Sequence, residues 1–138
     1  NLVDHFAGEK LTIEFRHNSW HNPEVLEAFK SLGIIATNVD YPPLAGLPKP
    51  KLELSSDIAY IRMHGRNKEK WWEGKDQSER HDYEYSSDEL KPWVLQIKEH
   101  EDELSQVYIM MQNTTKGHAL KNLQILKELF AEVGLSES

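Results

Sequence analysis

The residues from Ile58 to His64 alternate between apolar and polar side chains and end in groups that can bind anions and move protons. This alternation predicts a strand, with Arg62 and His64 on its polar face. A strand face that ends in arginine and histidine and then breaks at Gly65 is poorly suited to a core and well suited to a site.

Two other predicted strands carry a carboxylate near their carboxyl ends. Glu14, Asp40 and His64 are candidate catalytic acids or bases, and Arg16 and Arg62 would hold an anion. The alternative is a buried network in which Glu14 pairs with one arginine and has no further role. Because side chains alternate along a strand, the polar residues near the strand ends should share one inward face, which would carry Glu14, Arg16, Asn38, Asp40, Arg62, His64 and Gln112. The residues of the opposite face should pack beneath helices, and these are Ile13, Phe15, Val39, Ile61, Met63 and Met111.

A divalent metal is a second possibility for the same residues. Glu14, His17, Asp40 and His64 have suitable hard and borderline donor atoms. No compact ligand motif such as His-Glu-x-x-His occurs, so the sequence leaves the cofactor undetermined.

A long polar and aromatic loop is predicted over residues 65–85. Loops of this length in compact domains often act as lids or binding loops. Its tryptophans could stack on a sugar or nucleobase, or one of them could anchor the loop to the sheet. The candidate substrate- or anion-binding residues of this loop are Arg66, Asn67, Trp71, Arg80 and Tyr83.

A second candidate anion site precedes the last predicted helix. Lys116 supplies positive charge, and Gly117 permits a close approach of the backbone to a ligand. The alternative is a turn glycine beside a solvated lysine.

The elements that would position these side chains alternate between strands and helices. An alternation of this kind predicts an α/β fold with parallel strands and right-handed crossovers. We expect strands at 11–16, 34–40, 58–64 and 106–112. Helices are expected after Asn22, after Ser86 and over the apolar stripe from Leu120 to Val133, which Gly134 ends, with a proline-rich irregular connection over 41–57.

Composition limits the classes of function. The chain has 138 residues, a net charge of -7 and no cysteine. One domain is expected, broad nucleic-acid or membrane binding is disfavoured, and thiolate chemistry and disulfides are excluded. The absence of a long apolar run or a signal peptide predicts a cytoplasmic protein. Because Leu2, Val3 and Phe6 resemble the last turn of a helix, we expect the chain to be part of a longer protein.

Several motifs resemble the YecE-like family, also called domain of unknown function family 72. They are Glu14-Phe15-Arg16-His17, Asp40-Tyr41-Pro42, the segment from Ala59 to Asn67, Arg80 through Asp82 with Tyr83 and Tyr85, Lys116-Gly117 and Asn122. The resemblance implies a TIM-like barrel of about twice this length, so the present chain would be its carboxy-terminal half, with four strands. It implies no established reaction.

The chain differs from the family pattern at two places. It has Gln112-Asn113-Thr114 where the family tends to have Asn-Asn-His, and His81 where the family tends to have Tyr. Thr114 cannot replace the acid-base or ligand role of a histidine. We therefore expect either an enzyme-like protein with a phosphate- or anion-binding pocket, or a non-catalytic nucleotide or nucleic-acid binding protein. The missing amino-terminal half or a second copy is the expected partner.

Overall fold

The structure is a computed structural model that describes residues 11–14, 22–68, 82–113 and 117–135 of the chain. Within these ranges it confirms the predicted α/β fold with parallel strands. The elements are β1 (Leu11–Ile13), α2 (Pro23–Leu32), β2 (Ile34–Asp40), β3 (Ile58–Met63), α5 (Ser87–Glu99), the 3-10 turn η2 (Glu101–Glu103), β4 (Gln106–Met111) and α6 (His118–Glu132).

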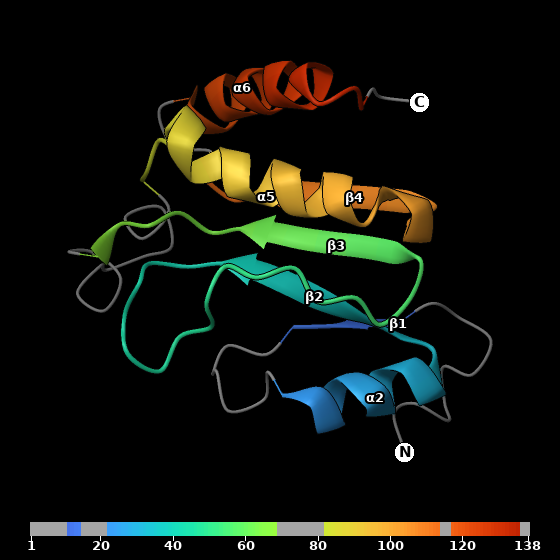
Figure 1. The fold of residues 1–138 in the computed structure, drawn as a ribbon. Coiled ribbons are helices and arrows are strands. Elements are labelled where there is room, and N and C mark those ends of the chain that lie inside the picture. The colour runs from blue at the N-terminus through green and yellow to red at the C-terminus, as the bar shows by residue number, and fades with distance from the viewer. Residues whose placement is uncertain (1–10, 15–21, 69–81, 114–116, 136–138) are drawn as a thin grey trace.

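The sheet follows chain order. Strands β2, β3 and β4 form a continuous parallel sheet, and the short β1 pairs in parallel with β2 (Figure 1). Asp40 is level with Met63, and Met63 is level with Met111. Because neighbours in register point to the same face of a sheet, this register decides which side chains of different strands can meet.

Helices α5 and α6 cover one face of β3 and β4. Ala59, Ile61 and Met63 are at most 1% exposed and belong to one core cluster with Trp93 of α5 and Leu126 of α6. The prediction that Ile61 and Met63 pack beneath helices is therefore confirmed. The same alternation leaves Tyr60 and Arg62 on the opposite face.

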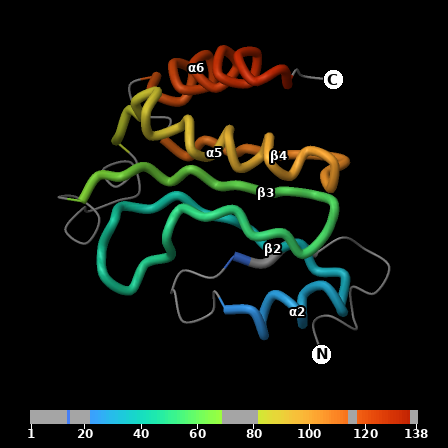
Figure 2. Tube along the Cα trace, viewed as in Figure 1, coloured from blue at the N-terminus to red at the C-terminus, as the bar shows by residue number. Residues whose placement is uncertain are grey.

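The irregular segment 41–57 covers the same face of β2, where its prolines prevent a long helix. Hydrogen bonds from β2 hold this segment against the sheet. The Asn38 side chain donates to Glu53 O at 3.1 Å and accepts from Glu53 N at 2.7 Å. Ser55 Oγ likewise donates to Ile34 O at 2.7 Å and accepts from Ala36 N at 2.8 Å. Figure 2 shows this segment returning along β2.

The helix ends follow the sequence signals. Asn22 accepts from Val25 N at 2.9 Å at the start of α2, and Gly33 ends that helix with φ 71°. Ser86 and Glu89 form a capping box at the start of α5. Pro92 lies inside α5, yet the helix begins directly after the box. Pro92 is solvent-exposed, so its missing N–H leaves a carbonyl that water can reach.

The opposite face of the sheet is less well covered. Val39 lies there with Tyr41 and Leu47 in a small second cluster, so the prediction that Val39 packs beneath a helix is wrong. At the β4 edge, Tyr108 is 45% exposed and Met110 is 43% exposed. The described part of this face therefore presents apolar and aromatic surface to solvent.

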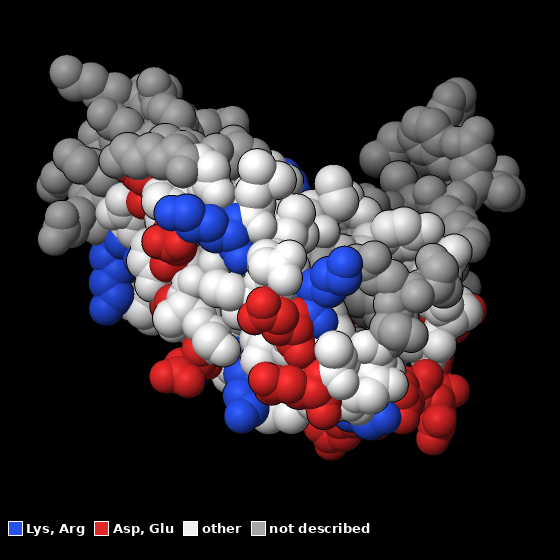
Figure 3. Space-filling model, turned by 90° about the horizontal axis from the view of Figure 1, so that it is seen from above, with Lys and Arg blue, Asp and Glu red and all other residues white. Residues whose placement is uncertain are grey.

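The surface seen from above α6 carries charges of both signs (Figure 3). Acidic and basic side chains are interspersed on this face. Among the described residues, no helix is long and apolar enough to cross a membrane.

Candidate functional site

The carboxyl ends of β1, β2 and β3 bring the candidate residues to one edge of the sheet. In parallel α/β folds this edge is where ligands usually bind. Glu14 directly follows β1, Asp40 ends β2 and His64 directly follows β3. Their faces differ, however, because Asp40 is in register with Met63 and Val39 is in register with Arg62.

Glu14, Arg62 and His64 form one polar cluster, called here the Glu14 cluster. Arg62 Nη1 donates to Glu14 Oε2 at 3.2 Å, and His64 Nε2 lies 3.1 Å from Glu14 Oε1. The side chain of His64 is 3% exposed, that of Glu14 is 11% exposed and that of Arg62 is 29% exposed. Tyr41 stacks on the His64 ring, with the ring centroids 4.6 Å apart. One carboxylate thus joins an imidazole to a partly exposed guanidinium.

Asp40 forms a separate cluster on the helix side of the sheet, called here the Asp40 hub. Oδ1 accepts from Arg66 Nε at 2.8 Å and from the Tyr85 hydroxyl at 2.8 Å. Oδ2 accepts from Arg66 Nη2 at 2.6 Å and from Trp93 Nε1 at 2.8 Å. A carboxylate offers about four lone-pair positions, and all four are taken. Asp40 is 0% exposed, so neither oxygen faces solvent.

The hub continues outward through Arg66 and two tyrosines. Arg66 Nη1 lies 3.5 Å from Glu89 Oε2, which also accepts from the Tyr83 hydroxyl at 2.5 Å. The hydrogen bond to Asp40 raises the pKa of Arg66 despite its burial. Burial, with the hydrogen bond to Glu89, raises the pKa of Tyr83 to about 12. Burial and the Asp40 charge raise the pKa of Tyr85 well above its usual value.

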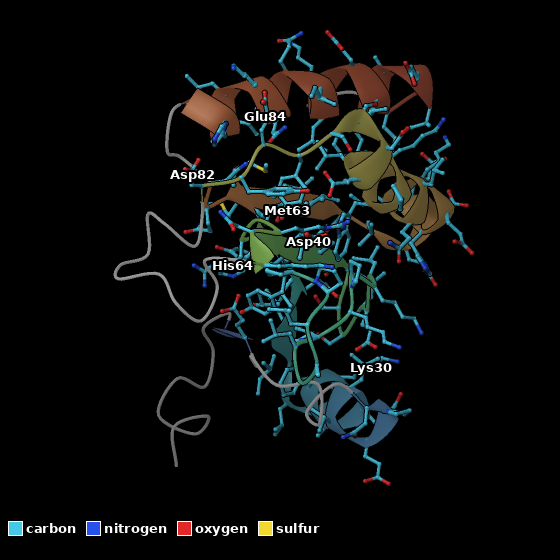
Figure 4. All side chains as sticks on the ribbon, turned by 90° about the vertical axis from the view of Figure 1, so that its left-hand side faces the viewer. Lys30, Asp40, Met63, His64, Asp82 and Glu84 are labelled. Carbon is cyan, nitrogen blue, oxygen red and sulfur yellow. The ribbon has the colours of Figure 1, made fainter. Side chains whose placement is uncertain are left out.

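The predicted pocket of Glu14, Asp40, Arg62 and His64 is therefore wrong in one member. Asp40 lies on the α5 side of the sheet and His64 on the other side (Figure 4). The predicted inward position of Asn38 is wrong for the same reason, since it contacts segment 41–57. Both errors arise because the register pairs Asp40 with Met63 and Asn38 with Ile61, and not with the residues on the face of Arg62 and His64.

The remaining predicted residues have mixed environments. Asn67 Nδ2 donates to Asp82 O at 3.0 Å, and Gln112 follows β4, where its backbone N–H donates to Met63 O at 2.9 Å. Gly117 precedes α6 with φ 75°, a conformation that favours glycine. Arg16, His17, Trp71, Trp72, Arg80 and Lys116 lie outside the described residues.

The predicted metal ligands do not come together in the described part of the chain. Among the described residues, no group of three or more His, Asp or Glu side chains could hold a metal ion. Glu14 and His64 are adjacent, but Asp40 is enclosed on the other side of the sheet.

Sequence reasoning missed a polar cluster near the start of α6. His118 Nε2 lies 2.9 Å from Asp82 Oδ1, and the buried Asn113 donates to Tyr83 O at 2.7 Å. Asn122 holds the backbone of Tyr85 by two hydrogen bonds, from Tyr85 N at 3.0 Å and to Tyr85 O at 2.8 Å. The available signal was a histidine directly after a glycine at the start of a predicted helix.

Comparisons with known proteins agree with the motifs. The family model described as "Protein of unknown function DUF72" matches residues 1–137. The UPF0759 protein YunF of Bacillus subtilis (strain 168) is 30% identical over 127 residues, which are 85% of this chain and 45% of that protein. The predicted resemblance to the YecE-like family is thus confirmed.

Two solved structures are similar in fold. A DUF72 family protein of Thermotoga maritima MSB8 is 35% identical with a TM-score of 0.86, covering 94% of this chain and 49% of that one. A DUF72 family protein of Enterococcus faecalis V583 is 23% identical with a TM-score of 0.82, and the match covers 99% of this chain and 52% of that one. At this identity the match supports the fold and nothing further. The chain spans about half the length of these relatives. It belongs to the DUF72 family, whose function is unknown.

Proposed function

We propose that the Glu14 cluster is the acid-base and anion-binding centre of an enzyme-like protein acting on a phosphate-bearing or other anionic substrate. The observation that supports this proposal most directly is the environment of Arg62. Its side chain is partly exposed, and among the described residues its hydrogen bond to Glu14 uses one of five N–H donors. The remaining donors are suited to a phosphate or carboxylate.

The imidazole beside the same carboxylate supports proton transfer. Glu14 orients the His64 ring through Nε2, and the stacked Tyr41 ring restrains it from one side. A positioned histidine typically contributes about 10²- to 10⁴-fold to a reaction as general acid or base. Asp40 has no part in this proposal because its four acceptor positions are filled.

Phosphate binding tests the anion site. Inorganic phosphate should bind the full chain, and Arg62→Ala should weaken its binding by about tenfold or more, as expected for loss of a charged hydrogen bond. Arg62→Lys should weaken it less, because the charge is kept and the planar fork is lost. Lys98→Ala is the control, since Lys98 is exposed and pairs with Glu101. Equal affinity in all four proteins, measured by calorimetry, would remove Arg62 from the proposal.

Turnover distinguishes an enzyme from a binding protein. We expect slow hydrolysis of p-nitrophenyl phosphate or its diester, reduced by about 10²-fold or more in Glu14→Gln and in His64→Gln. Binding without hydrolysis that is insensitive to Glu14→Gln would favour the alternative, a nucleotide or nucleic-acid binding protein. That alternative depends on Trp71 and Arg80, which lie outside the described residues.

We further propose that the chain is half of a TIM-like barrel. The parallel strands in chain order, helices on one face and exposed Tyr108 and Met110 on the open face support this arrangement. The amino-terminal half of the family domain, or a second copy, would cover that face. Sedimentation tests it: a monomer with a cooperative melt independent of concentration would contradict the need for a partner.

A further inference from the structure

The Glu14 cluster holds a pair of opposite charges before any ligand binds. Glu14 is negative and Arg62 is positive, and a hydrogen bond of 3.2 Å from Arg62 Nη1 to Glu14 Oε2 joins them. The Glu14 side chain is 11% exposed, so a further negative charge beside it would be poorly solvated. An anion that binds here is therefore held better if a positive charge enters with it.

His64 can supply that charge, because histidine gains a proton close to neutral pH. Its Nε2 lies 3.1 Å from Glu14 Oε1, and its side chain is 3% exposed. The described titratable and charged groups around the ring are Glu14 after β1, Arg62 on β3 and Tyr41 after β2, which stacks on the ring. The Asp40 carboxylate lies in the hub on the other side of the sheet.

An anion on Arg62 would change the balance of charges around this ring. The carboxylate of Glu14 favours the protonated imidazole, and the like charge of Arg62 opposes it. A bound anion would offset the charge of Arg62, so the opposition would fall while the attraction to Glu14 stays. The present geometry suits the protonated ring, since its Nε2–H can donate to Glu14.

We infer that the Glu14 cluster takes up a proton on His64 when it binds an anion. The occupied site then holds this histidine in the charged form, which is the form that acts as a general acid. The inference rests on the proposed anion site at Arg62, and it selects acid from the two roles, acid or base, given to His64 above. Linkage is reciprocal, so protonation of His64 strengthens anion binding by the same factor, and the affinity should fall as the pH rises.

Sulfate is the probe for this inference. It stays a dianion near neutral pH and brings no proton of its own, whereas inorganic phosphate titrates in this range. Calorimetry of the full chain in buffers of different ionisation enthalpy, between about pH 6 and pH 9, counts the protons taken up. A tenfold coupling, within the usual range of about 5- to 150-fold, gives a maximum uptake of about half a proton per sulfate. The affinity should then fall by about tenfold in total across the titration.

Variants assign the proton to His64. His64→Gln should abolish both the uptake and the pH dependence of binding. His100→Gln is the matched control, because His100 faces the carboxylate of Glu103 in the same way at the end of α5, and it should leave the uptake unchanged. If His64→Gln does not fold, nitrogen NMR of the parent protein decides, since the His64 ring should become protonated as sulfate is added at the pH of greatest uptake.

The outcomes separate this inference from the proposed function. Sulfate binding that depends on Arg62, with an uptake below about 0.2 proton at every pH, would overturn the inference and leave the anion site in place. Equal uptake in His64→Gln, or an imidazole whose protonation does not change, would also overturn it. Sulfate that does not bind, or that binds equally well to Arg62→Ala, would overturn the anion site itself and the inference with it.

Discussion

Replacing Asp40 by Asn tests whether the buried carboxylate holds the hub together through its charge. The substitution keeps the shape of the side chain and replaces one acceptor oxygen by an amide that donates. Arg66, Tyr85 and Trp93 together direct four donors at the two oxygens, two at each. An amide at either position opposes two of those donors.

The structure sets the size of the effect. Removing one partner of a buried ion pair typically costs about 3–5 kcal/mol. Two features of Arg66 reduce this cost: its side chain is 21% exposed, and Glu89 Oε2 remains 3.5 Å from Nη1. A buried donor left unpaired, from Tyr85 or Trp93, adds about 1–3 kcal/mol. We therefore expect a loss of about 3 kcal/mol in the free energy of unfolding, a large part of the roughly 5–15 kcal/mol typical of a domain.

Urea unfolding monitored by circular dichroism measures this loss. With a slope of about 1–3 kcal/mol per molar, the unfolding midpoint of Asp40→Asn should fall by about 1–3 M. Asp102→Asn, an exposed residue of η2, is the control and should change stability by less than about 0.5 kcal/mol. A loss below about 1 kcal/mol for Asp40→Asn would show that the charge on Asp40 does not satisfy these donors, and the reasoning about the hub would be wrong.

Three further predictions concern single side chains. The pKa of Tyr83 is raised to about 12 in the folded protein, against about 10 in the unfolded chain. The resulting stabilisation is complete below about pH 10 and is lost as the pH rises toward about 12, so the free energy of unfolding of Tyr83→Phe should fall less than that of the parent over this range. Gly33→Ala should cost about 1 kcal/mol in urea unfolding, because φ is 71° and no atom crowds the new Cβ. Ser86→Ala should cost about 1 kcal/mol through loss of the α5 cap, and an unchanged midpoint would contradict the role of the Ser86 hydrogen bond to Glu89 N at 3.2 Å.

Local signals in the sequence predicted the elements well. The asparagine and serine caps and the stop at Gly33 act within one helical turn, so their effects can be read from neighbouring residues. The alternation in β3 was also readable, because its buried face is covered by α5 and α6 and its other face is only partly covered. These features depend on short-range chemistry alone.

The register between neighbouring strands could not be predicted from local signals. In β2 six of the seven residues are buried, so alternation gives no indication of which face carries Asp40. The register of β2 against β3 depends on contacts far apart in sequence, such as Trp93 with Asp40 and Asn38 with Glu53. A difference of one residue moves every side chain to the other face, and this is how Asp40 was assigned to the wrong cluster.

The two arginines near the end of β3 differ in a way that explains why we propose the anion site at the Glu14 cluster and not at the Asp40 hub. Arg66 has two carboxylates around its guanidinium, and the Tyr85 ring lies 5.7 Å from its central carbon. An anion binding there would compete with Asp40 and Glu89 for the same donors. Arg62 is more exposed, and among the described residues its ion pair is with Glu14 alone. The hub therefore fixes the backbone after β3, since the Tyr85 hydroxyl that donates to Asp40 also accepts from Gly65 N at 2.8 Å. Because Gly65 directly follows His64, the Asp40 hub on one side of the sheet helps to hold the His64 imidazole of the Glu14 cluster in place on the other side.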